Sequence, residues 1–129
     1  MIAYIDTSVF INVLLSQQGY KYFHTIMKRC KKLLSSPLIE AEVLTTCQRE
    51  NFDQKQAIEA LKEITLCFVE KSLIEKYEMI LKECNLKGAD AYHLATALYL
   101  DPSREFLHFL TDDLKQKEAA KKMGFKILS

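Results

Sequence analysis

The chain has 129 residues, a formal net charge of +1 at pH 7 and 49% apolar residues, with only three glycines and two prolines. This length suits one domain with a core of its own, and the composition excludes a disordered or collagen-like segment. A net charge so near zero favours no class of partner, and the two basic clusters are interpreted as solvated helix faces: Lys28, Arg29, Lys31 and Lys32, and Lys115, Lys117, Lys121 and Lys122.

Short apolar runs alternate with amphipathic segments, which predicts parallel strands joined by helices. The predicted strands are 2–5, 33–35, 66–69, 106–110 and 125–128. The first predicted helix is capped by Thr7 or Ser8 and ends at Leu15, and the second begins after Gly19 and reaches Leu33. Later helices begin at Ser36-Pro37, after the cap Asp53, and at a capping box of Ser72 and Glu75. The last two cover 89–100 and 114–123. Gly88 and Gly124 are expected to end helices in the left-handed conformation.

The four cysteines, Cys30, Cys47, Cys67 and Cys84, lie far apart without a Cys-x-x-Cys pair. This spacing predicts buried free thiols and neither a zinc site nor a redox motif. The opening residues do not resemble a secretory signal, and no apolar run approaches the roughly 20 residues that cross a bilayer. We therefore expect a cytoplasmic protein that has no membrane partner.

Carboxylates stand where several predicted elements end or begin. Asp6 follows the first strand, and Asp113 follows the strand over 106–110. Because ligands of an open parallel sheet gather outside the carboxyl ends of its strands, these two acids are expected to converge. Asp90 shares a predicted helical face with Leu94 and Leu98, where a carboxylate is costly unless it binds a cation, pairs with another group or receives helix N-terminal amides.

Two pairs of neighbouring acids leave alternatives open. Glu40 and Glu42 point about 200° apart on a helix, so at most one of them can face the site, and the apolar periodicity mildly favours burial of Glu40. Asp112 and Asp113 face opposite ways on an extended chain. One of these two aspartates is expected to serve a site while the other caps the following helix.

Several carboxylates drawn together repel one another and raise their pKa values unless a hard divalent cation lies between them. Oxygen-only ligands favour Mg²⁺ or Mn²⁺. The chain has no phosphate-binding glycine loop and no serine-histidine-acid order with supporting local signals. Metal-dependent chemistry is therefore the enzyme class that the residues support best.

Four segments, in this order and at these spacings, make the chain resemble a PIN-domain ribonuclease of the type found as VapC-like toxins in bacterial and archaeal toxin-antitoxin pairs. They are Tyr-Ile-Asp-Thr-Ser-Val-Phe-Ile at 4–11, Ser-Pro-Leu-Ile-Glu-Ala-Glu-Val-Leu at 36–44, Gly-Ala-Asp-Ala-Tyr-His-Leu-Ala-Thr-Ala-Leu at 88–98 and Phe-Leu-Thr-Asp-Asp-Leu at 109–114. The resemblance spans nearly the whole length.

The resemblance selects four acids as catalytic metal ligands. They are Asp6, Glu42, Asp90 and Asp113. The family glutamate stands just before Val-Leu, which favours Glu42 against the helical wheel, and the last acid follows the strand threonine by two positions, which favours Asp113. Ser8 and Thr111 match polar positions that lie near the metals or the substrate in the family. Asp112 occupies the variable position between Thr111 and the last acid.

The resemblance implies a single PIN-like domain over residues 1–129, folded as a three-layer α/β/α sandwich with a central, mostly parallel sheet. It also implies a Mg²⁺- or Mn²⁺-dependent endoribonuclease that cleaves single-stranded or structured RNA and leaves a 5′-phosphate and a 3′-hydroxyl, a homodimer, and a cognate antitoxin as partner. The alternative is a metal-binding regulatory or RNA-binding module with little turnover. A receiver-type phosphoacceptor is disfavoured, because its paired acids should follow the first strand.

Overall fold

The computed structural model describes residues 1–128. Its centre is a five-stranded parallel sheet with the strand order β3-β2-β1-β4-β5. The strands are β1 (Ile2–Ile5), β2 (Lys32–Ser35), β3 (Thr65–Leu66), β4 (Leu107–Leu110) and β5 (Lys126–Ile127). The chain builds outward from β1 to β3 and then returns to the other side of β1 as β4 and β5. The order thus reverses between β1 and β4, the place where parallel sheets bind ligands at their carboxyl edge.

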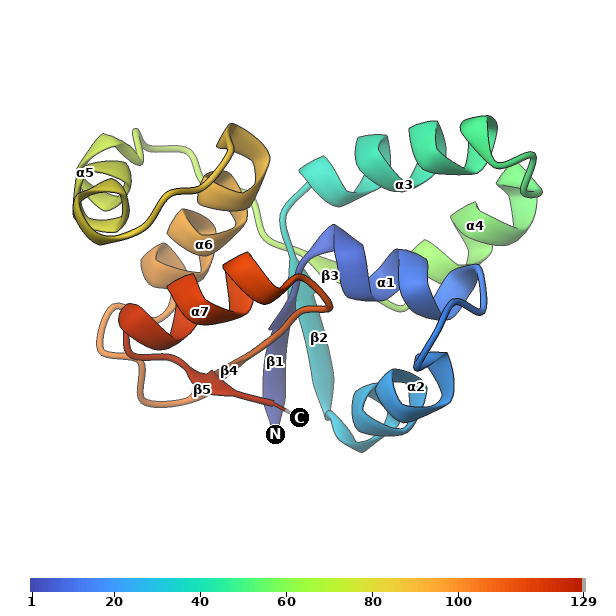
Figure 1. Ribbon diagram of the computed structural model, residues 1–129, viewed down its shortest axis with the longest axis horizontal. Coiled ribbons are helices and arrows are strands. Elements are labelled where there is room, and N and C mark those ends of the chain that lie inside the picture. Colours follow the sequence, from blue (N-terminus) through green and yellow to red (C-terminus); the bar gives the residue numbers. More distant parts are fainter. Residues whose placement is uncertain (129) are drawn as a thin grey trace.

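The helices cover both faces of this sheet, as Figure 1 shows, with α1 to α4 on one side and α5 to α7 on the other. Their bounds are α1 (Thr7–Leu14), α2 (Tyr20–Arg29), α3 (Leu38–Arg49), α4 (Gln54–Leu61), α5 (Ile74–Glu83), α6 (Gly88–Leu100) and α7 (Leu114–Lys122). This arrangement confirms the predicted α/β/α sandwich, whose central sheet is parallel at every pairing observed within residues 1–128.

Two hydrophobic cores lie on opposite faces of the sheet, and β1 contributes to both. Ala3 and Ile5 pack with the helices α1 to α4, whereas Tyr4 packs with α5 to α7. This alternation follows from the two-residue period of a strand. Because both faces are covered, β1 is apolar along its whole length, as buried parallel strands usually are.

Asp6, and neither Thr7 nor Ser8, is the N-cap of α1, which corrects the expected cap. Asp6 has extended backbone angles and its carboxylate accepts a hydrogen bond from the Val9 backbone N–H. A strand that ends directly at the start of a helix needs its capping residue at the junction itself, and an aspartate at that junction is one of the preferred caps.

The segment around α5 departs furthest from the sequence prediction. The helix ends at Glu83, and Gly88 begins α6 without a left-handed backbone conformation, so Gly88 is not a helix terminator. Leu73 is the N-cap of α5, and Ser72 accepts only the Ile74 backbone N–H, so the predicted capping box does not form. Gly124, by contrast, follows α7 with φ of +92° as expected.

Two further elements are shorter than predicted. The helix α2 ends at Arg29, because Leu33 belongs to β2, and β3 covers only two residues instead of 66–69. Among residues 1–128 the four cysteines are free of disulfides, as expected, but only Cys47 is fully buried. No helix in this part of the chain is long and apolar enough to cross a membrane.

Asp101 anchors the loop that leads into β4. Its side chain is buried, and its two carboxylate oxygens accept the backbone N–H groups of Glu105, Phe106 and Leu107 at 3.2, 3.1 and 2.9 Å. Burial alone would raise the pKa of Asp101, but these three backbone donors outweigh it and lower the pKa. The position of β4, and of the residues that follow it, therefore depends on this carboxylate.

Replacing Asp101 with alanine is expected to reduce the free energy of unfolding by about 2 to 4 kcal/mol, because three backbone N–H groups, that of the buried Leu107 among them, lose their acceptor. The matched control is Asp53→Ala, which removes an exposed helix cap and should cost about 1 kcal/mol. Urea denaturation of both variants measures the difference. Equal losses would show that Asp101 is no more than a surface cap.

Candidate functional site

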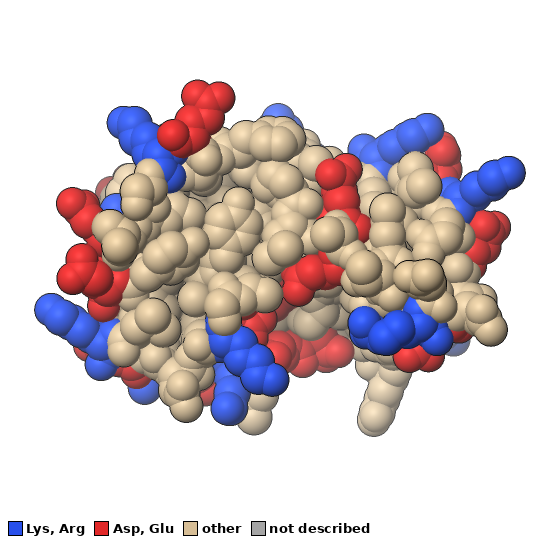
Figure 2. All heavy atoms as spheres, turned by 90° about the horizontal axis from the view of Figure 1, so that it is seen from above, with Lys and Arg blue, Asp and Glu red and all other residues tan. Residues whose placement is uncertain are grey.

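Acidic side chains from four parts of the chain surround one cavity of about 300 Å³ at the carboxyl edge of the sheet. Asp6 ends β1, Glu42 lies in α3, Asp90 lies in the first turn of α6, and Asp112 follows β4. The remaining lining residues are Thr7, Ser8, Ile11, Gln17, Thr46 and His93. Figure 2 shows acidic side chains near the middle of this face of the molecule.

Asp6 is the most deeply buried of these acids, with 2% of its surface exposed. Its Oδ1 accepts a hydrogen bond from Ser8 Oγ at 2.7 Å, and its Oδ2 accepts one from Thr111 Oγ1 at 2.5 Å. Burial raises the pKa of Asp6 from 3.8 to about 6, although the two hydroxyl donors and nearby His93 lower it in part. Asp6 is thus a buried carboxylate whose orientation is fixed by two hydroxyl groups.

The same two hydroxyls also fix the turn after β4. Ser8 Oγ accepts the Asp112 backbone N–H at 3.0 Å, and Thr111 Oγ1 accepts the Asp113 backbone N–H at 3.0 Å. The two oxygens lie 3.1 Å apart. The ends of β1 and β4 are therefore joined by side chains as well as by the sheet, and the predicted accessory positions Ser8 and Thr111 both contact Asp6.

Glu42 is held by a hydroxyl and an imidazole. Its Oε1 accepts a hydrogen bond from Thr7 Oγ1 at 2.6 Å and lies 3.2 Å from His93 Nε2, while 32% of the Glu42 side chain remains exposed. The hydrogen bond with His93 lowers the pKa of Glu42 most, burial opposes it, and Thr7 lowers it further. Glu42 is accordingly kept ionised beside the cavity.

The helical-wheel preference for burial of Glu40 is wrong, because Glu40 is exposed. The buried positions of α3 are Ile39, Val43 and Cys47, which repeat every four residues. On an ideal helix Glu40 lies about 60° from the centre of this stripe and Glu42 about 100° from it. The angle around the helix therefore does not explain why Glu40 is exposed while Glu42 lines the cavity.

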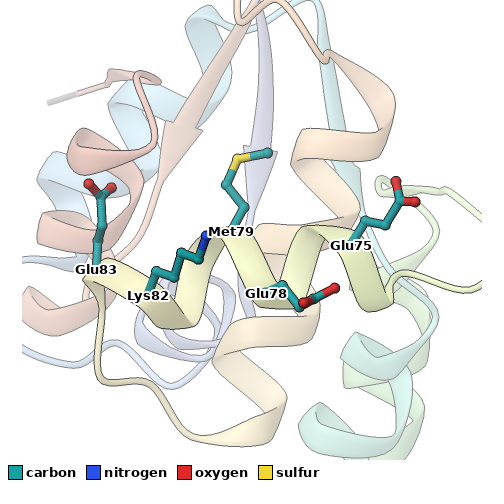
Figure 3. Close-up of a pocket in the computed structure, with 5 residues that line it drawn as sticks. All are labelled: Glu75, Glu78, Met79, Lys82 and Glu83. Carbon is teal, nitrogen blue, oxygen red and sulfur yellow. The ribbon is translucent and has the colours of Figure 1, made fainter.

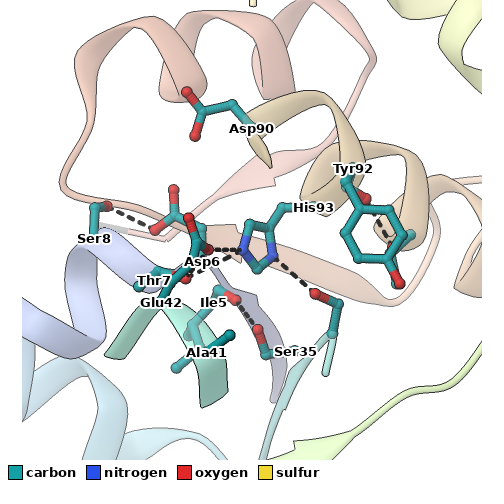
Figure 4. Close-up of polar contacts among 12 residues, drawn as sticks. Ile5, Asp6, Thr7, Ser8, Ser35, Ala41, Glu42, Asp90, Tyr92 and His93 are labelled. Atoms are coloured by element: carbon teal, nitrogen blue, oxygen red, sulfur yellow. Dashed lines mark hydrogen bonds and ion pairs between the residues drawn. The ribbon is translucent and has the colours of Figure 1, made fainter. Parts of the chain in front are cut away.

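Asp90 is half-buried and points toward the cavity from the start of α6, as Figure 4 shows. Within residues 1–128 its carboxylate makes no hydrogen bond, whereas its backbone carbonyl accepts one from the buried Gln116 Nε2 at 2.9 Å. Burial raises the pKa of Asp90, and the negative charges of Asp113 and Glu42 add to the increase. The backbone of Asp90 is therefore fixed while its carboxylate stays without a partner.

Asp112 and Asp113 divide their roles as an extended chain requires. Asp113 is the N-cap of α7, where its Oδ1 accepts the Gln116 backbone N–H at 3.1 Å. Asp112 is exposed, accepts a hydrogen bond from Asn12 Nδ2 at 3.1 Å and lines the cavity. Asp113 lines the neighbouring hollow instead, close enough to Asp90 to raise its pKa.

The donor set of this cavity fits a hard divalent cation. Four carboxylates line the cavity, and within the described part of the chain no lysine or arginine lines it with them. Oxygen-only ligands of this kind suit Mg²⁺ or Mn²⁺. As the side chains stand in residues 1–128, no three His, Cys, Asp or Glu groups converge closely enough to hold an ion, so binding would require carboxylates to move inward.

Sequence reasoning did not assign to the site several polar residues of this region: Tyr4, Thr7, Gln17, Thr46 and His93. The sequence predicted Thr7 only as a candidate helix cap, and it gave His93 no role beyond its place in the segment 88–98. A usable signal was present, since His93 interrupts the apolar run of α6, in which Ala91 and residues 94–98 are buried. A buried histidine needs hydrogen-bond partners, and here they are Tyr4, Thr7, Ser36 and Glu42.

Other hollows of the surface offer less chemistry. The one on α5 is lined by Glu75, Glu78, Met79, Lys82 and Glu83, and Figure 3 shows these side chains spread along that single helix. Because one exposed helix supplies all of them, no second element fixes their geometry. The cavity around Asp6 is different in that it unites β1, α1, α3 and α6.

Comparison with known proteins gives a family and a fold. The family model described as PIN domain matches residues 3–122. The structure is similar to VapBC2 from Rickettsia felis, crystallised with a DNA fragment from its promoter, with a TM-score of 0.69 and 14% identity over 100% of this chain and 98% of that chain. It is also similar to VapBC-1 from nontypeable Haemophilus influenzae, with a TM-score of 0.68 and 11% identity over 99% and 98% of the two chains. No curated protein sequence matches the chain significantly.

The raised pKa of Asp6 predicts a measurable pH dependence of stability in the absence of metal. The folded state holds the Asp6 proton more tightly than the unfolded state, so stability should fall as pH rises from about 4 through the folded pKa of about 6. The contribution is on the order of 2 to 3 kcal/mol. Urea denaturation with a chelator present should show this loss in the parent and not in Asp6→Asn. Parallel pH profiles for the two proteins would contradict the prediction, and Asp53→Asn serves as an exposed control.

Proposed function

The chain belongs to the PIN domain family, whose model matches residues 3–122, and from this premise we propose that it is a metal-dependent endoribonuclease cleaving single-stranded RNA. The observation that carries the proposal is the cavity in which the buried Asp6 lies with Glu42, Asp90 and Asp112 and with no lysine or arginine in its lining within the described part of the chain. A site of this charge suits a divalent cation and a phosphodiester substrate bound through it.

The proposed metal ligands are Asp6, Glu42, Asp90 and Asp113, with Ser8, Thr111 and Asp112 in accessory roles. A Mg²⁺ or Mn²⁺ ion at this site would supply Lewis acidity and lower the pKa of water, so that hydrolysis proceeds at neutral pH.

The protein's own contribution is orientation and charge. Ser8 and Thr111 occupy both oxygens of Asp6 with hydroxyl donors, which prevents the carboxylate from turning. Asp90 has no such partner among the described residues, so it is the acid that can turn toward an incoming cation. Burial raises the pKa of both Asp6 and Asp90, and a bound cation would oppose that shift by favouring the ionised carboxylates.

The two basic clusters of the sequence separate in the fold. Lys31 and Lys32 lie at the start of β2, at the amino edge of the sheet and thus opposite the acidic cavity. Lys115 and Lys117 lie in the first turn of α7, and Lys117 lines a hollow together with Thr111 and Asp113. We therefore assign contact with the RNA backbone to the start of α7, because phosphate contacts require a cation beside the scissile bond.

The biological setting is part of the same proposal. Both similar structures are of VapBC proteins, and the fold overlaps them along nearly their whole length. We propose that the chain acts as one domain, forms a homodimer, works in the cytoplasm and is the toxin of a toxin-antitoxin pair. The cognate antitoxin would then be its protein partner, as the sequence resemblance implies.

Single-carboxylate variants test the nuclease proposal. Asp6→Asn, Glu42→Gln and Asp90→Asn should each reduce Mn²⁺-dependent cleavage of a labelled single-stranded RNA about 100-fold or more, because loss of a ligand removes several kcal/mol of transition-state stabilisation. Glu40→Gln is the matched control, since it changes an exposed acid that lies two positions before Glu42 in the same helix. It should cleave like the parent.

The outcome also separates the two functions that the sequence leaves open. Full activity in Asp6→Asn and Asp90→Asn would show that the cavity is not the nuclease centre. Tight Mn²⁺ binding by the parent without cleavage of any RNA tested would identify a metal-binding module instead of an enzyme.

A second pair of variants tests whether Asp113 or Asp112 is the fourth metal ligand. Asparagine caps a helix as well as aspartate does, so Asp113→Asn should fold normally while it loses a carboxylate near Asp90. We expect Asp113→Asn to raise the Mn²⁺ concentration needed for half-maximal cleavage about tenfold or more. Asp112→Asn should have a smaller effect, because its carboxylate is exposed and already binds Asn12. The reverse order of effects would make Asp112 the ligand.

A further inference from the structure

We propose that His93 is a positioning residue that holds the Glu42 carboxylate at the cavity through its Nε2–H group, while Tyr4 fixes the imidazole in the tautomer that makes this possible. The inference rests on the proposed function in so far as Glu42 is taken to bind a cation. It adds to that function a residue outside the acidic set and a direction for each hydrogen bond.

The contacts of His93 connect three elements of the fold. Its side chain is 2% exposed, and its Nε2 lies 3.2 Å from Glu42 Oε1 and 3.2 Å from Thr7 Oγ1. Its Nδ1 lies 2.9 Å from the Tyr4 hydroxyl and, more distantly, 3.5 Å from Ser36 Oγ. Figure 4 shows Asp6, Thr7 and Glu42 together on one side of the His93 ring, with dashed lines running from the ring toward this group.

The direction of these hydrogen bonds follows from counting protons. Thr7 has one hydroxyl hydrogen, and it is donated to Glu42 Oε1 at 2.6 Å. The Thr7 oxygen can then only accept from His93 Nε2, and an ionised Glu42 can only accept as well. His93 Nε2 must therefore carry a hydrogen, which in a neutral imidazole leaves Nδ1 as an acceptor for the Tyr4 hydroxyl.

Tyr4 is suited to this role because it is fixed and keeps its proton. Its side chain is fully buried and stacks on Phe109 with ring centroids 5.5 Å apart. Its ring meets that of His93 edge to face at 5.8 Å. A tyrosine hydroxyl keeps its hydrogen at neutral pH, so it is available as a donor. The hydrogen bond to Nδ1 consequently favours the tautomer with hydrogen on Nε2.

This arrangement assigns His93 a positioning role and not a role as general base. The nitrogen that lacks a hydrogen faces Tyr4 inside the core, whereas the nitrogen nearest the cavity already donates to Glu42. His93 therefore has no free acceptor with which to remove a proton from water at the site. Without His93, Glu42 would keep only Thr7 as a side-chain partner on a half-exposed helix face.

The test is equilibrium Mn²⁺ binding, measured by electron paramagnetic resonance on the purified full chain. His93→Leu should weaken Mn²⁺ binding about 10- to 100-fold, the loss typical when a hydrogen-bond partner of a metal ligand is removed. His93→Gln should stay within a few-fold of the parent, because its amide nitrogen can replace the Nε2 donor. Rescue by glutamine distinguishes a hydrogen-bonding role from mere filling of space.

A matched control and a second readout keep the inference testable if His93→Leu is unstable. His108→Leu changes a half-buried histidine of β4 that contacts none of the four acids, and should bind Mn²⁺ like the parent. Nitrogen-15 chemical shifts of the parent imidazoles at neutral pH should show His93 with hydrogen on Nε2 and none on Nδ1. In Tyr4→Phe the Nδ1–H tautomer should become populated, with a few-fold loss of Mn²⁺ affinity.

The results separate this inference from the nuclease proposal. Hydrogen on Nδ1 in the parent, or Mn²⁺ binding by His93→Leu equal to that of the parent, would overturn the role of His93 while leaving RNA cleavage by the parent intact. Conversely, a parent that binds Mn²⁺ through Glu42 and loses affinity in His93→Leu, yet cleaves no RNA, would support the role of His93 and contradict the nuclease. Failure of the parent to bind Mn²⁺ would overturn both.

Discussion

The buried carboxylate of Asp6 is the constraint around which this edge of the molecule is built. A carboxylate removed from water is costly unless donors surround it, and here Ser8 and Thr111 supply one hydroxyl to each of its oxygens. Its position as the cap of α1 adds the favourable field of a helix N-terminus. Because Thr111 follows β4, the same bonds fix the end of one strand against the end of its neighbour.

The other acids of the cavity differ in how many hydrogen bonds orient their carboxylates, and this difference suits a site that binds a cation. Glu42 is kept ionised by His93 and Thr7, so its charge is present before any ligand arrives. Asp90 is surrounded by negative charge and has no hydrogen-bond partner among the described residues, so a cation would relieve its repulsion. A fixed acid, an oriented acid and a free acid together can accept a cation without rebuilding the fold.

Much of the architecture was predictable, because strands buried on both faces and amphipathic helices leave strong local patterns. The run 2–5 and the stop at Gly124 are examples. The errors arose where local signals compete. Gly88 looked like a helix terminator but begins α6, and Glu40 looked buried although it is exposed and Glu42 lines the cavity instead. A helical wheel gives only the angle of a residue around its helix, whereas the packing of the helix decides which positions along it are covered.

The sequence by itself determined the parallel α/β fold class and the kinds of oxygen ligand available, because the alternation of strands with helices and the carboxylate positions follow from patterns within each segment. Only the tertiary structure decided which acids share a cavity and what holds them. Tyr4 and His93 are 89 positions apart, and their hydrogen bond exists because β1 and α6 pack on the same core. Hydrogen bonds of this kind join segments that have no local pattern in common, so no reading of either segment alone predicts them.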